Sequence, residues 1–292
     1  MMTAPRNSTP EDGTVNLFDG LCSLRWLGTN CLLLQCGETH LLIDPHFSRP
    51  SLPALLRKIK PDPERIRHGV ERLGLDRLDA VLITHTHYDH FLDAFETARL
   101  LQADLYGSES VLRAAGRDQA ARVHAVQPGQ AYRVGSFTVN FLPTRHLVFP
   151  ARAADLLHMN EEIEQSLKPP VWFWQYRAGT VYNLLIEVAG HRVYLQGSAG
   201  LCEDCAAVPM AEAAVLGIGA LGLKSRAYLR RWYGQAVENT DVKQIYLSHW
   251  DDFFRPWDEH PRDLPGTRRV IRNIRRLAAG RGNITINRLP PG

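Results

Sequence analysis

The sequence predicts an α/β domain built as a four-layer αββα sandwich, in which two β-sheets lie between two layers of helices. Two observations lead to this prediction. Short apolar runs typical of strands occur in two series, and segments with helical spacing accompany each series. The chain has 292 residues, of which 45% are hydrophobic and 22% charged, so it is long enough to bury a large core.

The first series contains short strands joined by tight turns. Gly28–Asn30 and Gly37–Thr39 supply turns between the first three strand candidates. Asp79–Thr84 is an apolar run of the kind found in a strand buried on both faces, and helical spacing follows over residues 91–102. The other strand candidates of this half are residues 21–27, 31–36, 41–44, 105–106, 122–126, 132–134 and 137–142.

The second series has strand candidates at residues 181–188, 191–195, 213–216 and 244–247. Helices are expected over residues 225–235 and 266–279. The last of these has an apolar face and an arginine-rich face, the latter with Arg268, Arg269, Arg272, Arg275 and Arg276. We interpret these arginines as a solvated helix face, with phosphate or membrane binding as the alternative.

The domain limits follow from composition. Residues 1–20 are expected to form a flexible lead-in, and residues 21–292 a single domain. Within it, residues 147–180 form an insertion that contains Phe149, Leu156, Leu157 and Met159 and the aromatic group Trp172, Phe173, Trp174 and Tyr176. We expect this insertion to be a lid or an apolar substrate wall, and packing onto the sandwich is the alternative.

Charge and cysteine content indicate the cellular setting. The net charge of +3 neither requires nor excludes an anionic partner. The five cysteines, an odd number in a long chain, are typical of reduced thiols, and the CxxC pair Cys202 and Cys205 is by itself a weak signal. We find no secretion signal and no transmembrane segment, so a cytoplasmic protein is expected.

The run His85-Thr86-His87-Tyr88-Asp89-His90 carries the chemistry. On an extended segment, His85 and His87 project to the same side. Three imidazoles and a carboxylate within six residues would be costly to bury without partners, whereas zinc accepts mixed sets of such ligands. The run therefore predicts a site for a divalent metal.

This pattern, which follows a buried strand, resembles the signature of the metallo-β-lactamase superfamily, whose fold is an αββα sandwich. Leu42–Pro45, Phe141–His146 and Leu247–Trp250 resemble further landmarks of that family in the same order. Within it, these segments are most similar to the branch that contains N-acyl-phosphatidylethanolamine phospholipase D and L-ascorbate-6-phosphate lactonase.

The resemblance implies a ligand set. It makes His85, His87 and His146 the ligands of a first metal, and Asp89, His90 and His249 those of a second. Asp89 and His249 are then the candidate catalytic residues, with Asp89 placed to orient a water molecule or to accept its proton. Asp44 is expected to support a ligating histidine from outside the ligand set.

The sequence departs from the family at one position. After the strand around Val193–Leu195 the family places an aspartate that bridges two metals, and Ser198 stands there instead. A hydroxyl is a poorer ligand, so we expect one firmly bound Zn²⁺ and a second that is weakly held or absent. Asp204, Asp251, Asp252 or a bridging hydroxide could substitute for the missing carboxylate. Iron and manganese are alternatives to zinc.

The implied activity is hydrolysis of an ester, lactone or phosphodiester bond in a small substrate, for which the aromatic insertion suggests an amphipathic molecule. One alternative is an iron-dependent oxidoreductase at the same site, and another is a binding protein that lost catalysis with the bridging carboxylate. No nucleic-acid partner is expected, and the sequence does not indicate an oligomeric state.

Overall fold

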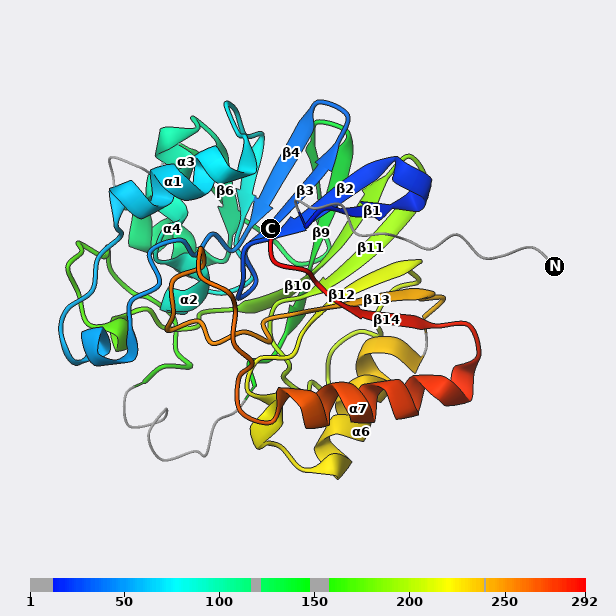
Figure 1. Ribbon diagram of the computed structural model, residues 1–292. Helices are drawn as coiled ribbons and strands as arrows, with labels where there is room; N and C mark the ends of the chain where they lie inside the picture. The colour runs from blue at the N-terminus through cyan, green and yellow to red at the C-terminus, as the bar shows by residue number, and fades with distance from the viewer. Residues whose placement is uncertain (1–12, 117–121, 148–157, 239) are drawn as a thin grey trace.

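The computed structural model describes the chain except residues 1–12, 117–121, 148–157 and 239. Two seven-stranded sheets face each other between two helical layers (Figure 1), and the predicted four-layer αββα sandwich is confirmed. Within the described residues, no helix has the length and apolar character needed to cross a membrane.

The first sheet has the strand order β1 to β7. Its antiparallel part is β1 (Val15–Leu17), β2 (Cys22–Trp26), β3 (Leu32–Cys36) and β4 (Thr39–Ile43), and its parallel part continues through β5 (Ala80–Leu82), β6 (Asp104–Gly107) and β7 (Val123–Ala125). Strand β1 pairs with β2, and Leu17 is fully buried. Part of the segment expected as a lead-in therefore belongs to the sheet.

The second sheet has the order β14 to β8. Its strands are β8 (Ala131–Val134), β9 (Phe137–Thr144), β10 (Val181–Val188), β11 (His191–Gln196), β12 (Ala213–Gly217), β13 (Gln244–Ser248) and β14 (Thr285–Arg288). Strands β8 to β11 are antiparallel neighbours, whereas β11 to β14 run parallel. The parallel strands bring several carboxyl ends to one edge, where irregular loops can carry functional side chains.

Helices α1 (Pro63–Leu73), α2 (Tyr88–Phe91), α3 (Ala94–Leu100) and α4 (Glu109–Ala115) accompany the first sheet, and α6 (Arg226–Tyr233) and α7 (Thr267–Ala278) cover the second. The ends of α1 follow from its sequence. The Asp62 carboxylate accepts hydrogen bonds from the first backbone N–H groups, and Gly74 ends the helix in the left-handed conformation.

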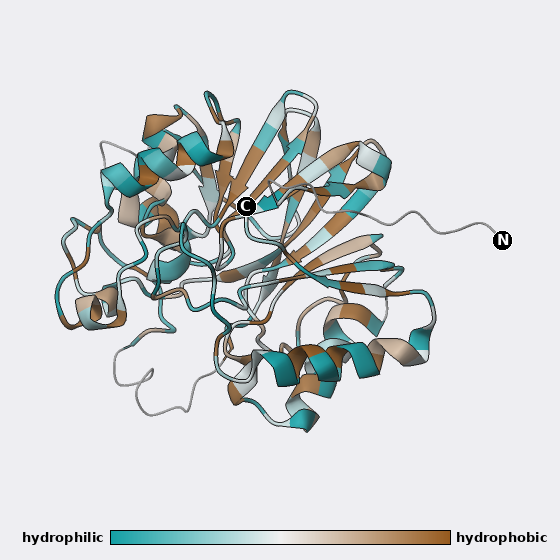
Figure 2. Ribbon diagram, viewed as in Figure 1, coloured by the Kyte–Doolittle hydropathy of each residue, from teal (hydrophilic) through white to brown (hydrophobic). Residues whose placement is uncertain are grey.

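Alternation along the central strands separates two cores. In β4, Leu41 and Ile43 face the other sheet, whereas Leu42 packs among the residues beneath the helices. Val81 of β5 is likewise turned towards the helices. Helix α7 also has two different sides (Figure 2): its apolar side packs on the sheet, and its arginine side faces solvent. Strands with two buried faces are what the apolar run at residues 79–84 predicts.

The cysteines differ from expectation. Cys202 and Cys205 form a disulfide, with their Cα atoms 5.4 Å apart, so the expectation of reduced thiols is wrong for this pair. The short CxxC separation holds the two sulfur atoms in one loop, which permits the bond. Cys22, Cys31 and Cys36 are free and buried. The cytoplasmic location stays a prediction.

Candidate metal centre

Three histidines from the two sheets meet at one edge of the sandwich. His85 and His87 follow β5, and His146 follows β9. One ring nitrogen of each lies within 4.8 Å of the others. His87 Nδ1 and His146 Nε2 are 3.2 Å apart. These are the residues that the resemblance assigns to the first metal, and the structure brings them together.

The second predicted group also converges. Asp89 and His90 lie in α2, and His249 directly follows β13. Their ligand atoms again lie within 4.8 Å of one another. Asp89 Oδ2 is 3.4 Å from His249 Nε2 and 3.6 Å from His90 Nε2. All six predicted ligand residues therefore occupy two adjacent clusters. The chain connects them directly, since His87 belongs to the first cluster and Asp89 to the second.

Burial sets the ionisation of the first cluster, and neighbouring charges set that of the second. It lowers the pKa of His85, His87 and His146, which keeps these imidazoles neutral at pH 7, as metal ligation requires. Burial alone would raise the pKa of Asp89, but His90 and a hydrogen bond from His249 hold it well below its usual range. Asp89 is therefore an ionised carboxylate at neutral pH.

The donor atoms fit a divalent cation. His85 Nε2 is buried and has no hydrogen-bond partner among the residues that the structure describes, and His249 Nδ1 is in the same position. A buried polar atom without a partner is costly, and coordination of an ion would remove that cost at the His85 nitrogen. Imidazoles with one carboxylate form a ligand set that zinc, iron and manganese all accept.

Asp44, the residue expected to support a ligating histidine, contacts His90 of the second cluster. It follows β4, and its carboxylate accepts hydrogen bonds from the Thr84 backbone N–H and hydroxyl at 2.8 and 2.6 Å. His90 Nδ1 lies 2.7 Å from Asp44 Oδ2, so its other nitrogen is left to face Asp89. Asn30 donates a further bond to Asp44. Sequence reasoning missed Thr84 and Asn30, which carry no recognisable pattern.

Ser198 lies beside the first cluster but has a different partner. Its hydroxyl oxygen accepts a hydrogen bond from the backbone N–H of Leu147, next to His146, at 3.1 Å. The suggested substitutes for a bridging carboxylate are held elsewhere. Asp204 is 86% exposed beside Arg145, Asp251 forms an ion pair with Arg49, and Asp252 accepts from the Phe254 N–H.

Sequence reasoning also missed the groups that hold His249. This residue has a left-handed backbone (φ 53°), and its N–H donates to the Thr29 carbonyl at 2.7 Å. The Thr29 N–H in turn donates to Asp251, which pairs with Arg49 at 2.8 Å. Gly219 lies against the His249 ring, where a Cβ atom would come within 2.7 Å of Nδ1. For this glycine the sequence does give a signal, because Gly217, Gly219 and Gly222 within residues 216–223 indicate a tight loop whose backbone approaches the site.

A family model described as the beta-lactamase superfamily domain matches residues 39–250, well over half of the chain. The chain belongs to the beta-lactamase superfamily. Among curated proteins, the UPF0173 metal-dependent hydrolase of Ruegeria sp. (strain TM1040) is 28% identical over 123 residues, which cover 42% of this chain and 48% of that protein. The chain thus spans about half the length of the curated relatives it matches first.

Two solved structures show the same superfamily fold. The metallo-beta-lactamase fold protein YhfI from Bacillus subtilis aligns over 91% of this chain and 90% of its own, with a TM-score of 0.55 and 17% identity. CmlA, a diiron β-hydroxylase from Streptomyces venezuelae, aligns over 92% of this chain and 53% of its own, with a TM-score of 0.56 and 15% identity. At this identity the likeness concerns the fold alone.

In this superfamily member both clusters open into a pocket of about 360 Å³. Besides the polar ligands, its walls are largely apolar and include Leu55, Leu147, Met159, Phe173, Leu223 and Phe253. The predicted insertion contributes to these walls through Leu147, Met159 and Phe173. The parts of the insertion prediction that concern Phe149, Leu156 and Leu157 lie outside the described residues.

Proposed function

We propose that this chain is a metal-dependent hydrolase that cleaves an ester, lactone or phosphodiester bond in a small amphipathic molecule. The observation that carries the proposal is the pair of clusters, each with three ligand atoms within 4.8 Å, at the floor of one pocket. The superfamily relationship and the relatives named metal-dependent hydrolases support it.

We propose that His85, His87 and His146 hold one Zn²⁺ firmly, and that Asp89, His90 and His249 hold a second ion weakly or not at all. The reason is Ser198, whose hydroxyl brings no negative charge and already accepts the Leu147 N–H. A bound zinc ion would polarise the scissile group and lower the pKa of water to about 7.

The protein groups around this site have separable tasks. Asp89, ionised at neutral pH, accepts a hydrogen bond from an attacking water molecule and orients it. His249 Nε2 lies 3.4 Å from the Asp89 carboxylate and fixes its direction. The apolar walls bind the non-reacting part of the substrate and exclude bulk water, which strengthens every electrostatic interaction at the floor.

Elemental analysis of protein purified without added metal tests the metal assignment. We expect zinc near one ion per chain, and two tightly held zinc ions would contradict the argument from Ser198. Iron as the main metal would instead favour an oxidoreductase, the chemistry named for the fold neighbour CmlA. A parallel screen of phosphodiester, lactone and thioester substrates identifies the bond.

Two variants test the active site. His87→Ala should lose metal and fall below about 1% of the parent activity, because even groups behind the ligands contribute 10–100-fold. His68→Ala is the matched control, since the His68 side chain is 58% exposed and belongs to neither cluster. Undiminished turnover in His87→Ala would remove the catalytic assignment. If Ser198→Asp bound a second metal and became much more active, the result would favour the alternative that the parent chain is a binding protein that lost catalysis with the bridging carboxylate.

A further inference from the structure

A second groove, more open than the metal pocket, lies at the start of α7. Its volume is about 740 Å³. Its polar lining includes Arg262, Arg268 and Arg288, and its apolar lining includes Pro261, Leu289 and Pro290. It shares one lining residue, Leu264, with the metal pocket. The groove is therefore a separate place on the molecule, and nothing in the proposed hydrolysis uses it.

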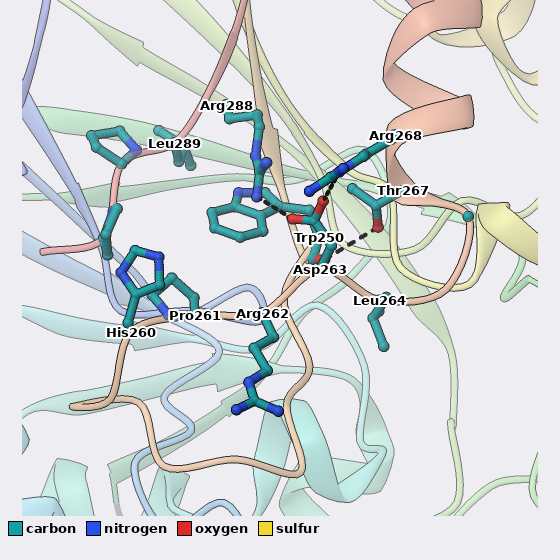
Figure 3. Close-up of a pocket in the computed structure, with 13 residues that line it drawn as sticks. Trp250, His260, Pro261, Arg262, Asp263, Leu264, Thr267, Arg268, Arg288 and Leu289 are labelled. Atoms are coloured by element: carbon teal, nitrogen blue, oxygen red, sulfur yellow. Dashed lines mark hydrogen bonds and ion pairs between the residues drawn. The ribbon is translucent and has the colours of Figure 1, made fainter.

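Two guanidinium groups converge in this groove. In Figure 3 the side chains of Arg268 and Arg288 both reach towards Asp263, beside the Trp250 indole. Arg288 Nη2 is 2.6 Å and Arg268 Nε is 3.5 Å from the Asp263 carboxylate. One carboxylate therefore orients two cations and neutralises one of them. Arg268 approaches this carboxylate through its Nε, so its two terminal nitrogens take no part in the contact with Asp263 and remain able to donate to a ligand.

The local charge is positive beyond this pair. Arg262, whose guanidinium points away from Asp263 in Figure 3, adds a further cation to the lining. The groove also lies at the amino end of α7, which is 12 residues long, and Gly266 at its N-cap has no side chain to accept from the first N–H groups. A helix start of this kind favours an anion.

An independent observation points to a missing partner. Trp250 lines the groove and is only 3% exposed, yet its indole Nε1 has no hydrogen-bond acceptor within the described part of the chain. The Arg288 guanidinium lies over the same ring, 3.6 Å from its centre. The buried indole N–H without an acceptor therefore lies at the base of the groove beneath the Arg288 guanidinium, and an oxygen-rich anion bound at Arg288 and Arg268 would supply the kind of acceptor that this position lacks.

We propose that this groove binds the phosphate group of a small organic phosphate. Phosphate is favoured because it matches the planar forks of arginine and carries enough charge to offset the excess cations. The prolines and Leu289 supply an apolar surface for the organic part of the ligand.

Isothermal titration calorimetry with phenyl phosphate and inorganic phosphate tests the site. We expect one saturable site that is kept in His87→Ala, in which the first metal cluster is removed. Arg268→Ala should bind phenyl phosphate about tenfold more weakly, and Arg268→Glu should abolish binding. Both variants should fold, because the Arg268 side chain is 91% exposed and glutamate is favourable in a first helical turn.

Arg272→Ala is the matched control, since Arg272 is exposed on the same helix but does not line the groove. It should bind with unchanged affinity. An equal loss in Arg272→Ala and Arg268→Ala would overturn the proposal in favour of general attraction to the arginine face. Loss of phenyl phosphate binding in His87→Ala alone would assign the phosphate to the metal site and would also overturn the proposal.

A last arm separates two sources of the phosphate. Vesicles of phosphatidylcholine that contain phosphatidic acid are sedimented with the parent chain and with Arg268→Glu. Sedimentation that depends on Arg268 identifies a lipid headgroup as the ligand in the groove. Binding of phenyl phosphate without sedimentation identifies a free organic phosphate.

Discussion

Replacing Arg49 with methionine should lower the free energy of unfolding by about 3–5 kcal/mol, because it leaves the Asp251 carboxylate buried without its cation. Arg49 Nη2 and Asp251 Oδ2 are 2.8 Å apart, and the two side chains are only 2% and 1% exposed. Arg49 also donates to the Leu27 carbonyl and to the Thr29 hydroxyl. The Thr29 N–H still donates to Asp251 in the variant, so the lower end of the range is expected.

A double-mutant cycle separates the pair from its surroundings. Asp251→Asn keeps an acceptor for the Thr29 N–H but leaves Arg49 as an unpaired buried cation, so this variant should lose a similar amount. The double variant Arg49→Met/Asp251→Asn should lose clearly less than the sum. Urea denaturation followed by linear extrapolation gives all three values. Additivity within about 0.5 kcal/mol would refute the argument that the two charges depend on each other.

The exposed pair Arg67 and Glu64 in α1 is the control for these measurements. Its side chains are 49% and 80% exposed, so Arg67→Met should change stability by no more than about 1 kcal/mol. Arg49 donates to the Thr29 hydroxyl, and the Thr29 carbonyl accepts the N–H of His249. Arg49→Met should therefore also weaken metal binding at the second cluster.

Two further predictions concern single positions. Gly219→Ala should displace the His249 ring and weaken metal binding at the second cluster without unfolding the chain, since the new Cβ would lie 2.7 Å from Nδ1. Gly280→Ala is the control, because Gly280 has open space around it. Unchanged metal titrations in Gly219→Ala would contradict this prediction. Burial raises the pKa of Asp93 from 3.8 to about 6, so its contribution to stability is full below about pH 4 and is lost as the pH rises through 6. Asp93→Asn should remove this dependence, and the stability difference between parent and variant should shift by ~3 kcal/mol between pH 3 and pH 8. A difference that stays constant with pH would show that Asp93 does not titrate in this range.

Local patterns explain which features could be predicted from the sequence. The strand at residues 79–84 and the amphipathic α7 follow from periodicity, because burial of one or two faces leaves a regular trace in the residue order. The run His85–His90 is compact enough to indicate a metal site without any alignment. His146 and His249 are single residues far away, and only the resemblance to a family connected them with it.

The rest depends on contacts between distant residues. Arg49 and Asp251 are about two hundred positions apart, and neither sits in a distinctive pattern. The hydrogen bond from Leu147 to Ser198 involves a backbone group, which any residue would provide. The disulfide between Cys202 and Cys205 was missed because the spacing alone fits a bond, a metal site or two free thiols equally well.

The first cluster takes His85 and His87 from the loop after β5 and His146 from the loop after β9, which belong to different sheets. A cation held there would join the two halves of the sandwich by coordinate bonds across their open edge. Since a ligand that binds only the folded state stabilises it in proportion to the logarithm of its free concentration, the heat tolerance and protease resistance of this chain would follow the metal supply of the cell. A low concentration of the ion would then shorten the lifetime of the protein as well as reduce its activity.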